Sequence, residues 1–554
     1  MNIFKTISRS FLLATLLLTN GAAAMAEGNA AAGSAVSFDV NTRYSQLVIN
    51  SRLNDFYANT KQIGFGAFDD KGNKTENEKG ALSSLDYVSG LVAKAVLECV
   101  DYYKDSKTVN VKPWYYAVQY FGCKYDIANN GKVGKSFDDV NAVKLYFQLK
   151  DFAAAGTFAD GANYSNATTV TTSNARITDA LKGIAAADAT YAIGGKNSGS
   201  SLADAKGGWF HKSSYVDQIW CDGLYMGPAL LAMILNDKDC YNASIAISSN
   251  DWELIMKQFR ISWQYLWDDK VQLLYHAFTA NPGDNASKDW AGVTKGGGVY
   301  HSAEYWGRAM GWYFLALVDV LEQMEHAGMK DSNDYKTLHN YLNLLADGIA
   351  ARQDSKSGCW YQLMGHDDSY VAKSYPSYSY TSSPVANYLE ASCTAIFTAA
   401  YLKGQRLGMY TKDYSAVAQK AYKGMIEQFM KADGKGGVHI VGSCKSAGLG
   451  GSNYRTGSAD YYLMGKDTQP TSYDPKSSSF YTEGKIFGAF ILAATEYERA
   501  YMDGGHTSLA PVVPHAEPFL MGSIDMSRCY TLTGQKSPAT YTGIIIADGR
   551  KMVK

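Results

Sequence analysis

Apolar residues recur at spacings of three and four through most of this chain. Shorter stripes of this kind lie within residues 143–149, 224–235, 341–349 and 388–402. The spacing gathers apolar side chains on one face of a helix, so it predicts amphipathic helices that pack one face inward. The clearest stripes are Val88, Leu91, Val92, Ala95, Val96 and Cys99; Met310, Phe314, Leu317, Val318, Leu321 and Met324; and Ile486, Phe487, Phe490, Ile491 and Ala494.

Stretches rich in Gly, Ser and Asn separate these stripes. Residues 281–298 and 442–458 are the longest of them and are typical of loops. Many helices joined by long aromatic loops favour an all-α fold, either a helical barrel or a solenoid. Loops on such a scaffold commonly form the functional site at one end.

Two segments depart from the helical pattern. Residues 153–207 are rich in Ala, Gly, Ser, Thr and Asn, and we expect an insertion that decorates the surface, with one helix near 176–187. From Pro511 the pattern changes again, and residues 531–535 and 543–551 predict short strands around Gly turns. We expect residues 511–554 to form a small β-rich tail, which resembles the C-terminal secretion-sorting tails of some bacterial proteins.

The first residues predict a signal peptide. Lys5 and Arg9 precede the short apolar run 11–18, and the small residues 22–26 offer a cleavage site after Ala26. We therefore expect residues 1–26 to be removed and residues 27–510 to form the main domain. Export would place the protein in the periplasm, outside the cell or on its surface. No later segment approaches the roughly 20 apolar residues of a membrane-spanning helix.

Composition narrows the class of partner. The whole chain has 52 basic and 53 acidic residues, and loss of Lys5 and Arg9 leaves the mature protein slightly more acidic. Such a surface has no electrostatic footprint for nucleic acid. The 41 Tyr and 10 Trp favour carbohydrate, since aromatic rings stack on sugars, although tyrosines that merely pack the core would give the same count.

The eight cysteines do not have the spacing of a zinc site. Cys221 and Cys393 lie within apolar helical patterns, so we expect buried free thiols there. We expect no metal and no organic cofactor.

Three clusters place charged or imidazole groups beside tryptophan. The first runs from Trp209 to Met226 and contains Asp222 at the start of an apolar helix. Its carboxyl group is open to two interpretations: a helix N-cap, or a desolvated acid that transfers protons near neutral pH. The second cluster is Tyr275-His276, followed by Trp290, and the His there is either structural or functional.

The third cluster opens a predicted helix with Glu304-Tyr305-Trp306-Gly307-Arg308 and continues to Trp312. An arginine between tryptophans can bind a carboxylate through its planar fork, and it can equally form a structural ion pair.

Together the clusters resemble the unsaturated rhamnogalacturonyl hydrolases, glycoside hydrolase family 105, which are related to the unsaturated glucuronyl hydrolases. The family's His-Lys, Tyr and Gln-x-Trp-x-Asp-Gly-Leu-Tyr-Met run is matched by residues 211–226. Its Trp-x-Arg-x-x-Gly-Trp is matched by residues 306–312, and its Tyr-His by residues 275–276. The similarity extends from about residue 86 to residue 499, apart from the expected insertion.

This resemblance implies an (α/α)6 barrel and a set of site residues. The key catalytic aspartate falls on Asp222. A second family aspartate falls on Asp138, with Asp139 as the alternative because the insertion alters the usual spacing. The substrate-binding residues that the resemblance implies are His211, Trp220, His276, Trp306, Arg308 and Trp312.

The implied reaction releases a terminal 4,5-unsaturated galacturonic or glucuronic acid from pectin-derived oligosaccharides by hydration of the C4=C5 enol ether. Asp222 would donate a proton and then deprotonate the attacking water. Asp138 would orient either Asp222 or the water, and would help Asp222 to keep its proton by like-charge proximity. Two alternatives remain: an inverting glycosidase that uses paired carboxylates on saturated sugars, and a cell-surface protein that binds sugars without turnover.

Overall fold

The computed structural model describes side chains in most of the chain and the backbone alone in three short C-terminal segments. Contacts divide the chain into two compact units, residues 1–506 and residues 507–554. The described residues are 30–53, 68–74, 85–124, 136–241, 247, 250–283, 290–293, 298–373, 383–450, 455–472 and 484–502, and, as backbone, 529–531, 544–547 and 550–553.

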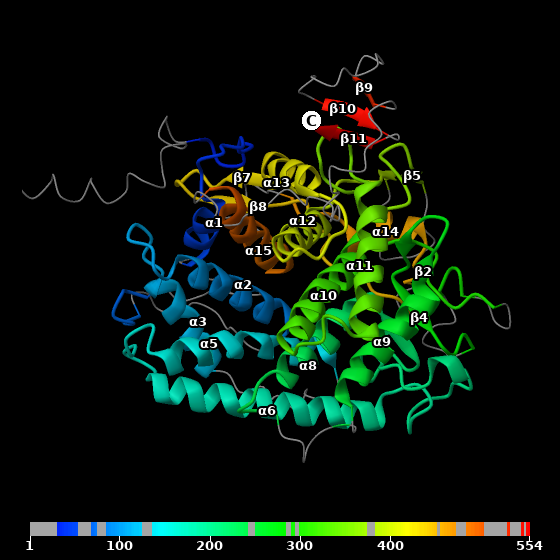
Figure 1. Cartoon of the computed structure of the whole chain (residues 1–554), viewed down its shortest axis with the longest axis horizontal. Helices are drawn as coiled ribbons and strands as arrows, with labels where there is room; N and C mark the ends of the chain where they lie inside the picture. Colours follow the sequence, from blue (N-terminus) through cyan, green and yellow to red (C-terminus); the bar gives the residue numbers. More distant parts are fainter. Residues whose placement is uncertain are drawn as a thin grey trace, which may run out of the picture. The chain divides into compact units, whose positions relative to one another are not determined.

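Within the described part of the first unit, an inner ring of helices surrounds the core (Figure 1). Helix α2 packs against α15, α15 against α12, α12 against α10, and α10 against α7 and α8. The segment η2 then contacts both α8 and α2, which closes the ring. The inner elements are α2 (Tyr87–Tyr103), α4 (Phe137–Val140), η2 (Asn141–Lys144), α5 (Leu145–Ala155), α7 (Cys221–Met226), α8 (Pro228–Leu235), α10 (Gly307–His326), α12 (Ala391–Arg406) and α15 (Gly484–Tyr501).

A second ring of helices covers the first. Each outer helix packs against an inner partner, and α1 at the start of the described chain packs against α15 near the end of the unit. This arrangement is an (α/α)6 barrel, so the all-α fold expected from the sequence is confirmed. The outer helices are α1 (Tyr44–Leu53), α3 (Lys112–Lys124), α6 (Asn166–Thr190), α9 (Asp251–Leu266), α11 (Asn333–Ala350) and α13 (Ser415–Phe429).

The two rings differ in how the sequence encodes them. Inner helices have protein on every side, and α10 is buried almost continuously from Gly307 to Leu321. Outer helices keep one face in water, so α11 buries only spaced residues such as Leu338, Leu342 and Leu345. Side-chain caps define several helix starts, among them Asp86 on α2 and Glu390 on α12.

The interpretation of residues 153–207 as surface decoration is wrong for α6. This helix spans Asn166–Thr190, well beyond the expected 176–187, and packs against α5 as its outer partner. Ile177, Leu181 and Ile184 are fully buried. Their spacing of three and four places them on one face, while the rest of that face consists of small residues that allow close packing.

Short antiparallel strand pairs join the helices of the first unit. The pair of most consequence is β1 with β4, in which Trp220 is opposite Ala277. The strands are β1 (Gln218–Trp220), β2 (Trp267–Asp268), β3 (Leu273–Leu274), β4 (Ala277–Thr279), β5 (Val371–Ala372), β6 (Val385–Ala386), β7 (Met430–Ala432) and β8 (Val438–Ile440); short helices α14 (Ala459–Met464), η3 (Ala203–Ala205) and η5 (Lys466–Thr468) complete the unit.

The second unit contains an antiparallel sheet with the strand order β11-β10-β9. Its strands are β9 (Cys529–Thr531), β10 (Ile544–Ala547) and β11 (Arg550–Val553). The small β-rich tail is therefore confirmed, while its role in sorting remains a prediction. The expected signal peptide, residues 1–26, lies outside the described residues.

Two further observations concern the described residues alone. None of their helices combines the length and the apolar character that a membrane-crossing helix requires. Cys221 and Cys393 are both buried free thiols, as expected.

Candidate active site

The N-terminal ends of the inner helices lie together, and they carry most of the residues singled out in the sequence. Asp138 lies on α4, Asp222 in the first turn of α7, and Arg308 in the first turn of α10. Glu390 caps α12, and its carboxylate forms an ion pair with Arg308 across the ring. The barrel therefore brings together groups that are far apart in the sequence.

Asp222 is held beside His276 by the β1–β4 pair. The backbone N–H of Cys221 donates to the carbonyl oxygen of His276 at 3.1 Å. Oδ2 of Asp222 then lies 3.5 Å from Nε2 of His276, and 16% of the Asp222 side chain is exposed. The N-cap of α7 is Trp220, so the interpretation of Asp222 as an N-cap is wrong. Its carboxyl group remains available to a ligand.

His276 is a fully buried, neutral imidazole. Burial lowers its pKa below the ordinary value, although Asp222 acts in the opposite direction. Its Nδ1 lies 2.6 Å from the hydroxyl of Tyr462, on α14. One ring nitrogen is thus tied to the protein, and the other faces Asp222.

Asp138 is an ion-paired carboxylate. Its Oδ1 lies 3.1 Å from Nε2 of His211, and its Oδ2 lies 2.5 Å from Nζ of Lys212. Burial by itself would raise the pKa of Asp138, but His211 and Lys212 outweigh burial and hold that pKa well below its usual range. These contacts favour Asp138 over Asp139 as the second aspartate of the site.

The ring of Trp220 contacts both the histidine that binds Asp138 and the histidine beside Asp222. This ring is stacked on His211, with centroids 5.5 Å apart, and on Tyr215, at 4.7 Å. Its edge meets His276 at 4.9 Å. The ring of Trp306 also lies beside His276, at 4.7 Å, and is itself stacked on Tyr462. The imidazole of His276 is therefore enclosed by aromatic rings.

Arg308 and Trp312 are less accessible than the sequence led us to expect. The guanidinium of Arg308 is buried and donates from Nε to Ser392 at 2.6 Å, and from Nη2 to Ser443 and to the carbonyl oxygen of Cys444. These contacts favour the structural-ion-pair interpretation of Arg308. Trp312 is stacked on Tyr225 at 4.9 Å and packs edge-on against Tyr87.

Several buried polar atoms around Trp220 have no hydrogen-bond partner within the described part of the chain. Leaving such an atom unpaired costs about 1–3 kcal/mol, so we expect water or a ligand to supply the partners of this cluster. Gln218 and Trp290 belong to the cluster because Gln218 accepts a hydrogen bond from Trp220 and Trp290 packs against it. The atoms are Nδ1 of His211, Nε2 of Gln218, Oδ2 of Asp222, Nε2 of His276 and Nε1 of Trp290.

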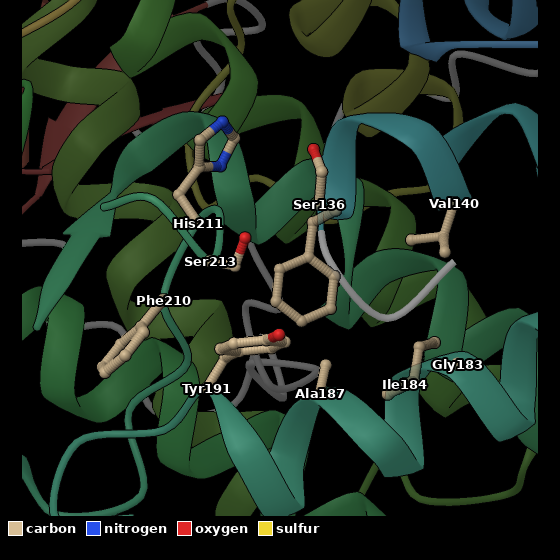
Figure 2. Close-up of a pocket in the computed structure, with 10 residues that line it drawn as sticks. Ser136, Val140, Gly183, Ile184, Ala187, Tyr191, Phe210, His211 and Ser213 are labelled. Atoms are coloured by element: carbon tan, nitrogen blue, oxygen red, sulfur yellow. The ribbon is translucent and has the colours of Figure 1, made fainter. Parts of the chain in front are cut away.

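A small pocket adjoins His211 (Figure 2). Figure 2 shows the imidazole of His211 at one end of this pocket and Ala187 and Ile184 of α6 at the other. Tyr191 and Phe210 also line it. The lining of this pocket is mainly apolar.

Three site residues were missed in the sequence: Tyr87, Tyr462 and Lys485. Burial raises the pKa of Tyr87 well above its ordinary value, and the charges of Asp138 and Asp222 add to the effect. Burial and the charge of Arg308 lower the pKa of Lys485 to about 7. Tyr87 and Lys485 both lie in the first turn of an inner helix, a position that would have identified them once the ring order was known.

The geometry defines a glycosidase-like site in a six-hairpin barrel, and the comparisons identify the family. Residues 197–501, more than half of the chain, match the model of Glycosyl Hydrolase Family 88. The chain therefore belongs to glycosyl hydrolase family 88, and it is a hydrolase that acts on oligosaccharides.

Curated relatives agree over a shorter range. The chain is 30% identical over 219 residues to Protein Atu3128 of Agrobacterium fabrum, which is 38% of this chain and 78% of that protein. A 24.9 kDa protein in the picA locus of Rhizobium radiobacter matches with the same identity and coverage.

Solved structures share the fold. A family 105 glycoside hydrolase of C. acetobutylicum ATCC 824 has a TM-score of 0.55 and 24% identity, covering 82% of this chain and 99% of its own. A possible member of the GH105 family from Salmonella enterica has a TM-score of 0.51 and 18% identity, covering 84% and 95%. These structures confirm the (α/α)6 fold that the resemblance implied, and the family model places the chain in glycosyl hydrolase family 88.

Proposed function

We propose that this protein removes a terminal 4,5-unsaturated galacturonic or glucuronic acid from pectin-derived oligosaccharides, as an unsaturated rhamnogalacturonyl hydrolase. The observation that carries the proposal is the unequal state of the two carboxyl groups. Oδ2 of Asp222 has no hydrogen-bond partner among the described residues, whereas Asp138 is bound to His211 and Lys212. We propose that Asp222 is the group that exchanges a proton with the substrate, whereas Asp138 is held as an anion by its partners.

Hydration of an enol ether requires one such proton-exchanging group. Protonated Asp222 donates its proton to C4, and positive charge develops at C5 and the ring oxygen. Water then adds at C5 and returns a proton to the Asp222 carboxylate. The resulting hemiketal opens at the bond between C5 and the ring oxygen, which leaves a ketone at C5. C1 now carries a hydroxyl and the aglycone oxygen, and this hemiacetal expels the remaining sugar.

The surroundings of Asp222 suit these steps. His276 is neutral, and its Nε2 is placed to hydrogen-bond to the carboxylate that forms when C4 is protonated. The aromatic rings of Trp220 and Trp306 contact His276 and help to bury it away from water. The positive ends of α10, α12 and α15 face this end of the barrel and favour an acidic sugar.

We propose a different role for Asp138 from the one that the resemblance implies. Because Lys212 and His211 neutralise its charge, like-charge repulsion is a weak means of keeping Asp222 protonated. We propose that Asp138 orients His211 instead. The stack of His211 on Trp220 also fixes the position of the imidazole, and we propose that His211 hydrogen-bonds a substrate hydroxyl.

The test compares matched disaccharides with and without the C4=C5 bond. The unsaturated uronate absorbs in the ultraviolet through its conjugated enol acid, and hydration removes that absorbance. We expect loss of absorbance and release of the second sugar from unsaturated disaccharides, and no release from the saturated ones. Cleavage of the saturated sugars would instead support an inverting glycosidase with paired carboxylates.

The aglycone and the location are separate parts of the proposal. A panel that varies the second sugar between rhamnose and galactose tests the rhamnogalacturonyl specificity through kcat/KM for each compound. We also propose that the protein is exported to the periplasm, the cell surface or the medium. N-terminal sequencing of the mature protein should begin at residue 27, and a protein that retains Met1 would contradict export through this segment.

A further inference from the structure

The hydroxyl of Tyr462 lies 2.6 Å from Nδ1 of His276, on the side of the imidazole opposite Asp222. Tyr462 is fully buried, and it was not among the residues singled out in the sequence. Its ring is also stacked on Trp306, so its position relative to His276 is fixed by packing as well as by the hydrogen bond.

The direction of this hydrogen bond depends on which of the two groups carries the shared proton. Burial raises the pKa of Tyr462 well above its ordinary value, so the phenol keeps its proton. In the described part of the chain, Nδ1 of His276 is the one acceptor within reach of that O–H. A buried phenol that accepted from Nδ1–H would leave its own proton unpaired, which is unfavourable. The phenol therefore donates to Nδ1.

The tautomer of His276 follows in turn. A neutral imidazole carries one ring proton, and burial lowers the pKa of His276 and keeps the ring neutral. Because Nδ1 accepts from Tyr462, the proton is on Nε2. That N–H points to Oδ2 of Asp222 at 3.5 Å, where both atoms are otherwise unpaired among the described residues.

We propose that Tyr462 is a positioning residue that locks His276 in the Nε2–H tautomer, so that Asp222 faces a hydrogen-bond donor. Such a donor stabilises the carboxylate form of Asp222, which exists after the proton has moved to C4. The inference rests on the proposed function for its catalytic consequence, whereas the tautomer itself is a property of the free protein.

The first experiment measures the tautomer directly. Two-bond ¹H–¹⁵N correlation spectra of ¹⁵N-histidine-labelled protein distinguish Nε2–H from Nδ1–H, and the His276 signals are assigned by their loss in His276→Gln. We expect Nε2–H in the native protein and a mixed or Nδ1–H state in Tyr462→Phe. An Nδ1–H tautomer in the native protein would overturn the proposal, whatever substrate the enzyme uses.

The second experiment measures kinetics. Tyr462→Phe should lower kcat about 10–100-fold with KM changed less than about threefold, because the lost interaction acts in the transition state. The acidic limb of its pH–rate profile should move to higher pH, since a freed Nδ1 accepts a proton more readily. Unchanged kcat and an unchanged profile would refute the positioning role.

A matched control is Tyr401→Phe. Tyr401 is also fully buried, and its hydroxyl donates to a backbone carbonyl oxygen, that of Ala346, at 2.6 Å. This variant loses one buried tyrosine hydroxyl as Tyr462→Phe does, so the two thermal melts should shift alike. Its tautomer spectrum and kcat should match those of the native protein. If no variant, native protein included, turns over unsaturated disaccharides, the proposed function fails and the tautomer result still stands.

Discussion

The two ends of the inner helices differ in how their polar groups are paired. At the N-terminal end, atoms of His211, Asp222 and His276 have no partner among the described residues. At the C-terminal end, Lys403 bonds both Asp319 and Glu322 at 2.7 Å. Both ends are built from charged residues on buried helices, so burial and charge alone do not mark a functional site. The N-terminal end differs in that its unpaired atoms are gathered on His, Asp, Gln and Trp side chains around the ring of Trp220.

The C-terminal end of the inner helices, which we call the closed end, contains a network of ion pairs. Lys94 pairs with Glu98 at 3.0 Å, and Arg406 holds Glu496 through two hydrogen bonds of 2.7 Å. Burial would lower the pKa of Lys403, but Asp319 and Glu322 outweigh it and raise that pKa well above the ordinary value. The charged groups of this network pair with one another, so they leave little for a ligand.

Breaking one pair at the closed end should therefore destabilise the fold without affecting turnover. Asp319→Asn leaves the buried Lys403 with Glu322 alone, and we expect the free energy of unfolding to fall by about 3 kcal/mol. Urea denaturation measures the loss, and kcat at a temperature where the variant is folded should stay within about twofold. A large fall in kcat with unchanged stability would reverse the assignment of the two ends.

Glu498 is an exception at the closed end, because it is a buried carboxyl group whose nearest partners are uncharged. It therefore tests how a buried carboxyl group without an ion pair behaves away from the site. It accepts hydrogen bonds from the backbone and hydroxyl of Ser45 and from Tyr103, and burial raises its pKa to about 7. A raised folded-state pKa means that the folded protein binds the proton more tightly. Its stabilising contribution is thus complete below the unfolded pKa near 4.5 and is lost as the pH rises through 7.

The measurement compares Glu498→Gln with the native protein across pH. The native protein should lose on the order of 3 kcal/mol from this group between pH 4.5 and pH 8, whereas Gln has no proton to lose. The gap between the two unfolding free energies should therefore move in favour of Glu498→Gln as the pH rises. A constant gap would show that Glu498 is ionised throughout.

The smallest predicted effect is at the N-terminal end of the inner helices, where Asp222 and His211 lie. A Cβ at Gly223 would lie 3.1 Å from Nδ1 of His211, so alanine there should displace the imidazole by a few tenths of an ångström. We expect kcat/KM to fall about 3–10-fold because the site geometry is disturbed. The thermal melt should stay level or rise, since alanine favours a helix over glycine by roughly 1 kcal/mol. Full activity would show that His211 tolerates movement.

Much of the fold could be predicted because helical spacing is a local signal. The inner helices have long apolar stripes, and α10 and α15 were identified from them. Helix α6 was misjudged because small and polar residues such as Thr169, Ser173 and Gly183 form much of its buried face. Close packing against α5 buries them, and no local pattern reports which partner a helix will have.

The sequence could predict those parts of the site whose reactive residues lie within short, recognisable motifs. Asp222 and Trp220 are neighbours in the chain, and strand pairing brings His276 to them, so those residues form one cluster as expected. Tyr462 contacts His276 across 186 positions, which composition cannot reveal. The sequence could not decide whether Arg308 binds a ligand or forms an ion pair within the barrel. Its partners Glu390 and Ser392 are far from it in the chain and come beside it only when the barrel folds.

The most direct test follows the ultraviolet absorbance of an unsaturated disaccharide with native protein and with Asp222→Asn. Because Oδ2 of Asp222 has no partner among the described residues, the substitution should leave the thermal melt and sugar binding nearly unchanged. We predict that kcat falls by about 10³-fold or more, the range expected for loss of a general acid and base. An Asp222→Asn variant that bleaches the substrate at the native rate would contradict the account.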